Sequence, residues 1–243
     1  MKRIDAHCVI GDFKRGATAP EAILEDMRLN GIDQAVIVPD DVCAAVDNAK
    51  GNEQIINAVE RNPDKFIGFA TVNPWYGEQA ARMLKQYLKR GLRGVYFKST
   101  VQGFMPDDEM LWPLLDICSE YKVPALFHTG TPVNALPFTV MTQALRYPNV
   151  DFILGHMGAN DYLGDAYAAV RLCDNIYLET SLNLTLSIRA AVKTRAERVL
   201  FGSGSPRSRM DFEFKKLYEA VPDSEKQELV LFRNMESILG GRK

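Results

Sequence analysis

The 243-residue sequence is poor in histidine and cysteine, and it lacks a long hydrophobic run. No apolar segment approaches the roughly 20 residues that span a bilayer, so we expect no membrane-spanning helix. The 29 basic and 31 acidic residues nearly cancel, at a formal net charge of −2. This balance gives no electrostatic reason to expect nucleic acid or an anionic membrane as a partner.

The few cysteines are widely separated and form no Cys-x-x-Cys pair; they are Cys8, Cys43, Cys118 and Cys173. This pattern favours reduced thiols over a disulfide framework or a thiolate zinc site. The N-terminus has basic residues but no apolar stretch behind them, so we do not expect a secretory signal. We therefore predict a cytoplasmic protein.

Short β-branched or aromatic segments alternate with longer amphipathic segments along the whole chain. This alternation is typical of repeated βα units and a parallel sheet. Successive segments start about 23 to 32 residues apart, which leaves room for a strand, a helix and two short loops but no linker for a second domain. We expect eight strands, which start near Ile4, Gln34, Phe66, Gly94, Pro124, Asp151, Ile176 and Val199.

Helix signals agree with this repeat. Thr18 and Glu21 have the spacing of a capping box, in which each side chain accepts a backbone N–H of the first turn. Pro20 fits that first turn, and Gly31 is a typical helix end. Further helices are predicted at residues 52–61, 78–90, 108–121, 140–147, 161–173, 185–194, 210–220 and 224–239.

Eight parallel strands, each followed by a helix, close naturally into a (β/α)8 barrel. A doubly wound sheet normally has about five to seven strands and a Gly-x-Gly-x-x-Gly turn after the first. The first strand here ends in residues 7–11, His-Cys-Val-Ile-Gly, instead. We therefore predict an α/β fold with a single TIM-barrel domain over residues 1–243.

All three histidines lie where predicted strands end. His7 ends the first strand, His128 the fifth and His156 the sixth. Active sites of such barrels are built at the C-terminal ends of the strands. Neutral imidazoles that converge from three strands are what a divalent metal, or proton transfer at neutral pH, requires. We therefore expect the three side chains to lie together at the mouth of the barrel.

The strand ends also resemble those of a known family. Ile4–His7, Leu126–Gly130, Ile153–Gly158 and Val199–Ser203 resemble, in order and spacing, the strand-end motifs of the amidohydrolase superfamily. The most similar branch is the amidohydrolase-related group that contains aminocarboxymuconate-semialdehyde decarboxylase-like enzymes and metal-independent pyrone-dicarboxylate lactonases. The resemblance covers nearly the whole chain and implies the fold more strongly than the reaction, because one barrel hosts many chemistries.

Two positions depart from the family pattern. The family's first strand normally ends His-x-His, but the second position here is Val9. Its eighth strand normally ends Gly-Ser-Asp, but this chain has glycine at the third position, Gly204. Valine offers no ligand atom and glycine has no carboxylate. The resemblance therefore implies a mononuclear metal site that has lost two usual ligands and its usual base.

Two alternatives follow for the cofactor. In one, a single divalent metal such as zinc is held by His7, His128 and His156, which would move His156 from its usual proton-shuttle role to that of a ligand. In the other, no metal binds and the imidazoles act as hydrogen-bonding or acid–base groups. Three histidines alone leave a metal without a carboxylate, which favours the second alternative.

Other candidates flank the histidines. Tyr96 and Lys98 share one face of the fourth strand, and Lys98 either binds a substrate carboxylate or is an ordinary surface lysine. Ser203 and Arg207 belong to the glycine-rich loop after the eighth strand, which suits an anionic group. Glu179 ends the seventh strand and is either a replacement base or a buried structural residue.

We predict a hydrolase, or less favourably a decarboxylase, that acts on a small carboxylated or cyclic ester or amide. His128 and His156 would polarise the scissile group or move protons. The alternative is a catalytically silent barrel that binds a small anionic ligand or a partner protein.

Asp40 and Asp41, after the second strand, are further acids within reach, although consecutive loop acids are usually solvated. The resemblance also implies a homodimer as one oligomeric state.

Overall fold

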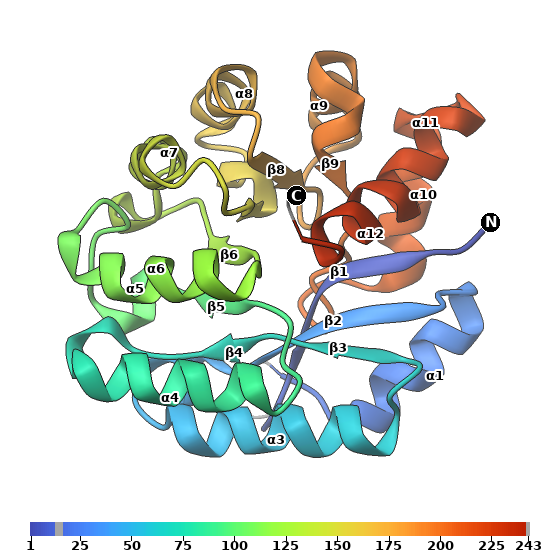
Figure 1. The fold of residues 1–243 in the computed structure, drawn as a ribbon. Coiled ribbons are helices and arrows are strands. Elements are labelled where there is room, and N and C mark those ends of the chain that lie inside the picture. Colours follow the sequence, from blue (N-terminus) through green and yellow to red (C-terminus); the bar gives the residue numbers. More distant parts are fainter. Residues whose placement is uncertain (13–16, 242–243) are drawn as a thin grey trace.

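The computed structural model describes residues 1–12 and 17–241. Parallel strands form the centre of the molecule, and helices lie around them (Figure 1). The strands are β1 (Ile4–Ile10), β2 (Gln34–Pro39), β3 (Phe66–Gly68), β4 (Ala70–Thr71), β5 (Val95–Phe97), β6 (Ala125–His128), β7 (Phe152–Gly155), β8 (Ile176–Glu179) and β9 (Val199–Leu200).

The nine labelled strands make eight barrel strands, because β3 and β4 are two parts of one strand. Between them, the Phe69 N–H donates to the Ile37 carbonyl at 3.1 Å and continues the pairing with β2. The barrel closes between β9 and β1, where the Ala6 N–H donates to the Phe201 carbonyl at 2.9 Å. The predicted (β/α)8 barrel is confirmed, and each predicted strand start lies within one residue of the observed one.

Helices connect the strands, and those predicted from the sequence are present with shifted ends. The last one is divided by a π-helical turn at Leu229–Arg233. Within the described residues, no helix has the length and apolar composition needed to cross a membrane. The helices are α1 (Pro20–Asn30), α2 (Asp41–Ala45), α3 (Asn48–Arg61), α4 (Glu78–Lys89), α5 (Ser99–Gln102), α6 (Trp112–Tyr121), α7 (Pro137–Arg146), α8 (Leu163–Leu172), α9 (Thr185–Arg195), α10 (Met210–Ala220), α11 (Ser224–Glu228) and α12 (Asn234–Leu239).

Helix α1 begins without the predicted capping box, so that prediction was wrong. Its N-cap residue is Ala19, and no side chain caps the helix. Thr18 is instead paired with β1, because its carbonyl accepts the Gly11 N–H at 3.0 Å. The other two signals hold: Pro20 is in the first turn, and Gly31, with a φ of 63°, ends the helix in the left-handed conformation.

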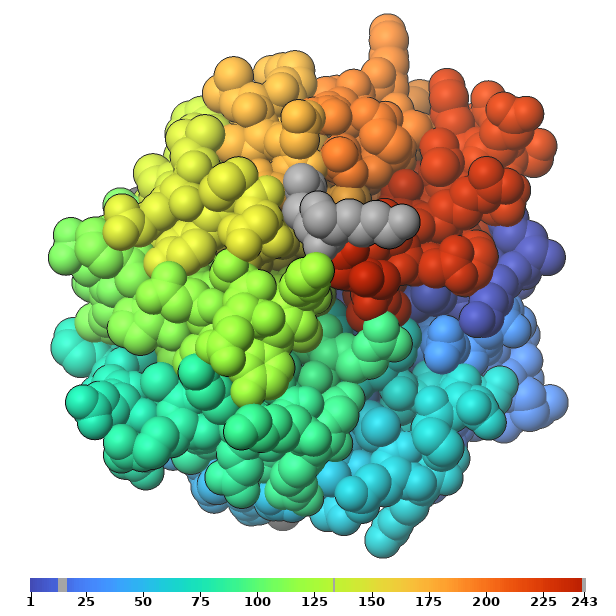
Figure 2. All heavy atoms as spheres, in the orientation of Figure 1, coloured from blue at the N-terminus to red at the C-terminus, as the bar shows by residue number. Residues whose placement is uncertain are grey.

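Two hydrophobic clusters fill the molecule on either side of the strands. The inner cluster contains inward side chains such as Val36, Leu126 and Leu200, together with Met235 and Ile238 of α12. Figure 2 shows α12 (red) packed into the middle of this face of the molecule. The outer cluster lies between the strands and the helices. Each buried aliphatic side chain contributes roughly 1.5–3 kcal/mol, so the ring is a packed core.

A bulge in β1 changes which of its residues face the interior. Asp5 pairs with Ala35, but the next paired residue, Cys8, is opposite Ile37, so β1 holds one extra residue. Before the bulge, Ile4 packs in the inner cluster; after it, Val9 packs against the same cluster. Bulges of this kind re-aim side chains next to active sites. Here the extra residue brings His7 onto the inner side of the barrel.

Candidate functional site

The three histidines lie next to one another: His128 ends β6 and His156 directly follows β7, whereas His7 lies within β1 and does not end it as predicted. The His7 and His156 side chains are buried, and their ring centroids are 4.9 Å apart. His128 is half-buried, and its ring lies 4.7 Å from that of His156 at an interplanar angle of 78°. The chain therefore places its entire histidine content at one end of the barrel.

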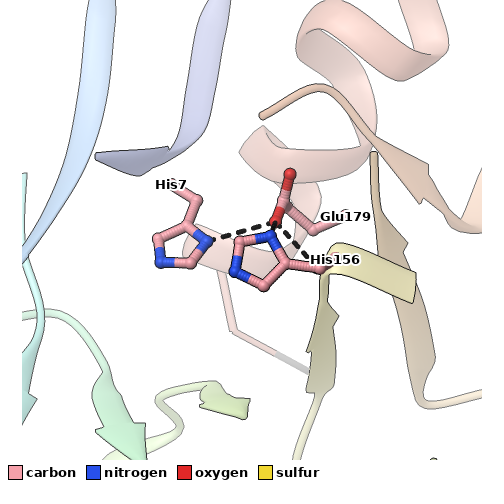
Figure 3. A group of neighbouring side chains, drawn as sticks. All are labelled: His7, His156 and Glu179. Carbon is pink, nitrogen blue, oxygen red and sulfur yellow. Dashed lines mark hydrogen bonds and ion pairs between the residues drawn. The ribbon is translucent and has the colours of Figure 1, made fainter. Parts of the chain in front are cut away.

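Glu179, at the end of β8, links two of these histidines. Its fully buried carboxylate accepts from His7 Nδ1 at 3.2 Å and from the His156 backbone N–H at 3.0 Å. Figure 3 shows the carboxylate next to both rings. Ser181 adds its backbone N–H at 2.5 Å and its hydroxyl at 2.8 Å. Burial alone would raise the pKa of Glu179, but the hydrogen bonds and the two histidines lower it to about 2.

These contacts also fix the orientation of the rings. His7 turns Nδ1 to Glu179, and its buried Nε2 has no hydrogen-bond partner among the described residues. His156 Nδ1 bonds the Ser181 hydroxyl at 2.7 Å. Both rings therefore turn one nitrogen toward Glu179 and the other away from it (Figure 3). Ser181 was not predicted as a site residue, although it lies only two positions after Glu179.

Burial keeps two of the imidazoles neutral. Burial, together with the proximity of His7, lowers the pKa of His156 to about 3. It also lowers the pKa of His128 well below its usual range, helped by His156 and by the positive charge of Lys98. At neutral pH, both rings therefore have a lone pair on one nitrogen and a proton on the other.

The backbone after β7 is left-handed over four residues. The φ angles of His156, Met157, Gly158 and Ala159 are 64°, 48°, 76° and 49°. For residues other than glycine this conformation costs roughly 1–2 kcal/mol each, and such strain concentrates at functional sites. Asn183 holds the turn by donating its amide to the His156 carbonyl at 2.7 Å. The strained turn fixes where the His156 ring enters the site.

A second cluster of charges lies at the same end of the barrel. Lys98 Nζ is 2.5 Å from Asp41 Oδ1, and an Arg207 guanidinium nitrogen is 3.0 Å from Asp41 Oδ2. Only 5% of the Lys98 side chain is exposed, so it is not an ordinary surface lysine. Burial lowers the pKa of Lys98, although Asp41 opposes this effect. Asp41 is therefore a paired carboxylate and not the solvated acid that its loop position suggested.

Tyr96 lies next to His7 in space and two residues before Lys98 in the chain. Its buried ring is 5.8 Å from the His7 ring. Burial raises the pKa of its hydroxyl, and the charges of Asp41 and Glu179 raise it further. Histidines, tyrosine and charged cluster thus belong to one site.

Ser203 and Asp40 have local structural contacts. The Ser203 hydroxyl accepts the Ser205 N–H at 3.1 Å, and the Ser203 N–H donates to Asp5 Oδ1 at 2.9 Å across the closing seam of the barrel. Asp40 caps α2, because one of its oxygens accepts two N–H groups of that helix. The structure therefore uses Ser203 at the seam, whereas Arg207 from the same loop reaches the charged cluster.

The group of donor atoms that lies together differs from the predicted three-histidine metal site. Ligand bonds of about 2.0–2.2 Å put two donors on one zinc ion at most about 4.4 Å apart. Among residues 1–12 and 17–241, the three-residue group whose ligand atoms meet within 4.8 Å is His7, His156 and Glu179, not the predicted set with His128. These groups already bond one another, since His7 donates to Glu179.

Val9 and Gly204, which stand where the family has metal ligands, offer no other ligand atom. Val9 packs its apolar side chain against the inner cluster. Gly204 has a φ of 65°, and a Cβ there would lie 3.0 Å from that of Ser181. An aspartate at this position would therefore need both a left-handed backbone and a shift of Ser181. We derive no chemistry through a metal for this reason.

We accordingly expect the purified protein to take up no stoichiometric zinc. Incubation with excess zinc should leave the midpoint of thermal unfolding unchanged, because a ligand that binds only the folded state would raise it. Metal content is measured by mass spectrometry after gel filtration. Stoichiometric zinc that disappears in His7→Ala or His156→Ala would contradict this expectation, whereas uptake that persists in both variants would come from elsewhere on the surface.

Comparisons with known proteins agree with the fold. The structure resembles 5-carboxyvanillate decarboxylase from Sphingomonas paucimobilis, at 14% identity over 99% of each chain and a TM-score of 0.80. It also resembles 2,6-dihydroxybenzoate decarboxylase from Rhizobium, at 17% identity over 99% of each chain and a TM-score of 0.77. At such identities the likeness shows the fold alone.

A hydrolase has the same fold. It is a probable 2-pyrone-4,6-dicarboxylic acid hydrolase from Acinetobacter baumannii with citric acid bound, at 15% identity over 99% of this chain and 100% of that one, with a TM-score of 0.76. No protein of curated function matches the sequence. The sequence profile of the family described as Amidohydrolase matches residues 6–234. The chain therefore belongs to the amidohydrolase family.

Proposed function

We propose that the protein hydrolyses a small carboxylated ester or amide, including cyclic ones, without a metal. The observation that carries the proposal is the pair formed by His7 and Glu179. A carboxylate that accepts from Nδ1 holds the imidazole in the tautomer whose Nε2 has a lone pair. That nitrogen is buried and has no partner among the described residues. His7 is thereby equipped as a general base in place of the aspartate that Gly204 replaces.

The proposed reaction begins when His7 Nε2 takes a proton from water as the water oxygen attacks the substrate carbonyl. Glu179 stabilises the imidazolium that forms, and it acts as a positioning residue because its oxygens accept hydrogen bonds from His7, His156 and Ser181. The neutral ring of His128 can donate to the carbonyl oxygen as it becomes negative. The proton on His7 then passes to the leaving oxygen or nitrogen, and the products are an acid and an alcohol or amine.

The charged cluster supports a substrate with a free carboxylate. Lys98 and Arg207 bring two positive charges to the site, while Asp41 brings one negative charge. A planar guanidinium and a buried ammonium are both strong partners for a carboxylate. Pyrone dicarboxylate, the compound in the name of one structural neighbour, combines a cyclic ester with carboxylates. We therefore place the substrate carboxylate near Lys98 and Arg207 and the scissile carbonyl near the histidines.

A panel of carboxylated lactones, aryl esters and small amides tests the proposal. Hydrolysis without added metal should fall by at least about 100-fold in kcat/KM in His7→Ala, because a general base typically contributes 10²–10⁴-fold. Arg209→Ala is the matched control, since Arg209 pairs with Asp211 on the protein surface.

Three results would overturn the proposal. They are undiminished hydrolysis in His7→Ala, a strict requirement for a divalent metal, and carboxylate binding without turnover of any compound in the panel. The last result would support the alternative of a silent, ligand-binding barrel, which is favoured by the loss of both family ligands at Val9 and Gly204. Carbon dioxide released from an aromatic carboxylate would instead point to a decarboxylase.

A further inference from the structure

We propose that Asp41 occupies the binding position of a substrate carboxylate, and that a small dicarboxylate displaces its side chain from Lys98 and Arg207. The inference deepens the proposed function, on which it rests for the shared site, by naming the substrate class. Its physical basis is a carboxylate of the protein itself that is held by two cations from two other loops.

The three residues come from separate parts of the barrel. Asp41 is the first residue of α2 after β2, Lys98 follows β5, and Arg207 lies in the loop after β9. One oxygen of Asp41 binds the ammonium at 2.5 Å and the other binds the guanidinium at 3.0 Å. The geometry is that of a carboxylate ligand bound between a lysine and an arginine.

The buried charge of Lys98 requires that another anion replace the Asp41 carboxylate when that carboxylate moves away. Lys98 is almost fully buried, and an unpaired buried charge is strongly destabilising. Asp41 should therefore leave only when another anion replaces it. A neutral ester cannot do so, whereas an incoming carboxylate restores the same ion pairs. The site thus selects compounds that have a carboxylate in addition to the scissile group.

The exchange requires movement of a side chain and not of the helix. Helix α2 is fixed because Asp40 caps it, Asn48 donates to two of its carbonyls at 2.8 Å, and Gln102 donates to the Ala44 carbonyl at 3.1 Å. The Asp41 side chain is 33% exposed, so it has solvent into which it can rotate. Lys98 and the backbone can remain in place while the carboxylates exchange.

The electrostatic environment of the histidines connects this position to the proposed chemistry. Lys98 and His128 directly follow Phe97 and Phe127, which pair between the neighbouring strands β5 and β6, so Lys98 lies next to the histidine site. The charge of Lys98 lowers the pKa of His128. Tyr96, two residues before Lys98, has its ring 5.8 Å from the His7 ring. A dicarboxylate with one group in place of Asp41 therefore extends toward the three imidazoles.

Titration calorimetry with phthalate, an aromatic dicarboxylate, tests the exchange without any need for turnover. Asp41→Asn should bind phthalate about tenfold more tightly than the wild type, because the internal competitor is removed and both cations remain. Asp211→Asn is the matched control. It also removes one aspartate charge from an ion pair with an arginine, Arg209, and it should leave the affinity for phthalate unchanged. Uncharged phthalamide should bind neither protein.

Further variants exclude indirect effects. Adding Lys98→Met to Asp41→Asn should abolish the gain in affinity. If Asp41→Asn does not fold, Asp41→Ser is used, and thermal unfolding of each variant verifies the fold. Equal or weaker binding of phthalate by Asp41→Asn, or no binding by any variant, would overturn the inference. Tighter binding without hydrolysis of the substrate panel would uphold it and reject the proposed function.

Discussion

Gly202→Ala is expected to lower the free energy of unfolding by about 3 kcal/mol. A Cβ at this position would lie 2.0 Å from Glu179 Oε1 and 2.5 Å from its carboxylate carbon. The carboxylate cannot move aside freely, because it accepts hydrogen bonds from His7, His156 and Ser181. The added methyl group must therefore either break these hydrogen bonds or displace the loop after β9. Urea unfolding monitored by circular dichroism measures the change.

Gly164→Ala is the matched control, because the same added methyl group would meet no atom within 4 Å. Gly164 lies within α8, where alanine is favoured over glycine by roughly 1 kcal/mol, so this variant should be neutral or more stable. Combining Gly202→Ala with Glu179→Ala should cost much less than the sum of the two single changes, because the clash disappears with the carboxylate. Similar stabilities for Gly202→Ala and Gly164→Ala would contradict the tight packing described for Glu179.

Glu179→Gln should have the largest effect on activity, a loss of roughly 10³-fold in kcat/KM. An amide has only one acceptor oxygen and cannot replace a carboxylate that accepts from four groups. Its NH₂ group would also favour the His7 tautomer that has its proton on Nε2, which cannot act as a base. Nitrogen-15 NMR of the imidazole detects the change of tautomer directly, independently of any substrate.

The same substitution should change the response of stability to acid. The pKa of Glu179 in the folded protein is about 2, below its ordinary value of 4.5. Its stabilising contribution is therefore complete above pH 4.5 and is lost as the pH falls toward 2, when the carboxylate takes up a proton. Unfolding curves at a series of pH values should show a smaller acid-induced loss in Glu179→Gln. An unchanged His7 tautomer together with an unchanged acid response would contradict the proposed pair.

The barrel could be predicted from the sequence because its signals are local. Apolar runs such as residues 152–155 and helix ends such as Gly31 are encoded by neighbouring residues, and the repeat length allowed the strands to be counted. The positions of His128 and His156 at strand ends follow from the same pattern. The capping box failed because Thr18 pairs with β1, a contact that its neighbours in sequence do not encode.

The interactions within the site could not be predicted in this way. Strict alternation from Ile4 would turn His7 away from the interior, and the bulge that reverses this has no sequence signal that we recognised. Asp41 follows another acid and looks solvated until Lys98 and Arg207 are placed next to it. Glu179 was recognised as a candidate, but its hydrogen bonds depend on how β1, β7 and β8 lie in space.

The closing seam of the barrel has a consequence for synthesis on the ribosome. The hydrogen bond between His7 and Glu179 joins residues 172 positions apart, and that between Asp5 and Ser203 joins residues 198 positions apart. Contacts between such distant residues incur their loop-closure entropy before they provide any stabilisation, and they form late. His7 lies in the first of the barrel strands to be translated, yet its site closes only with the last of them. A nascent chain that stops before β9 would display every histidine and still have no closed site.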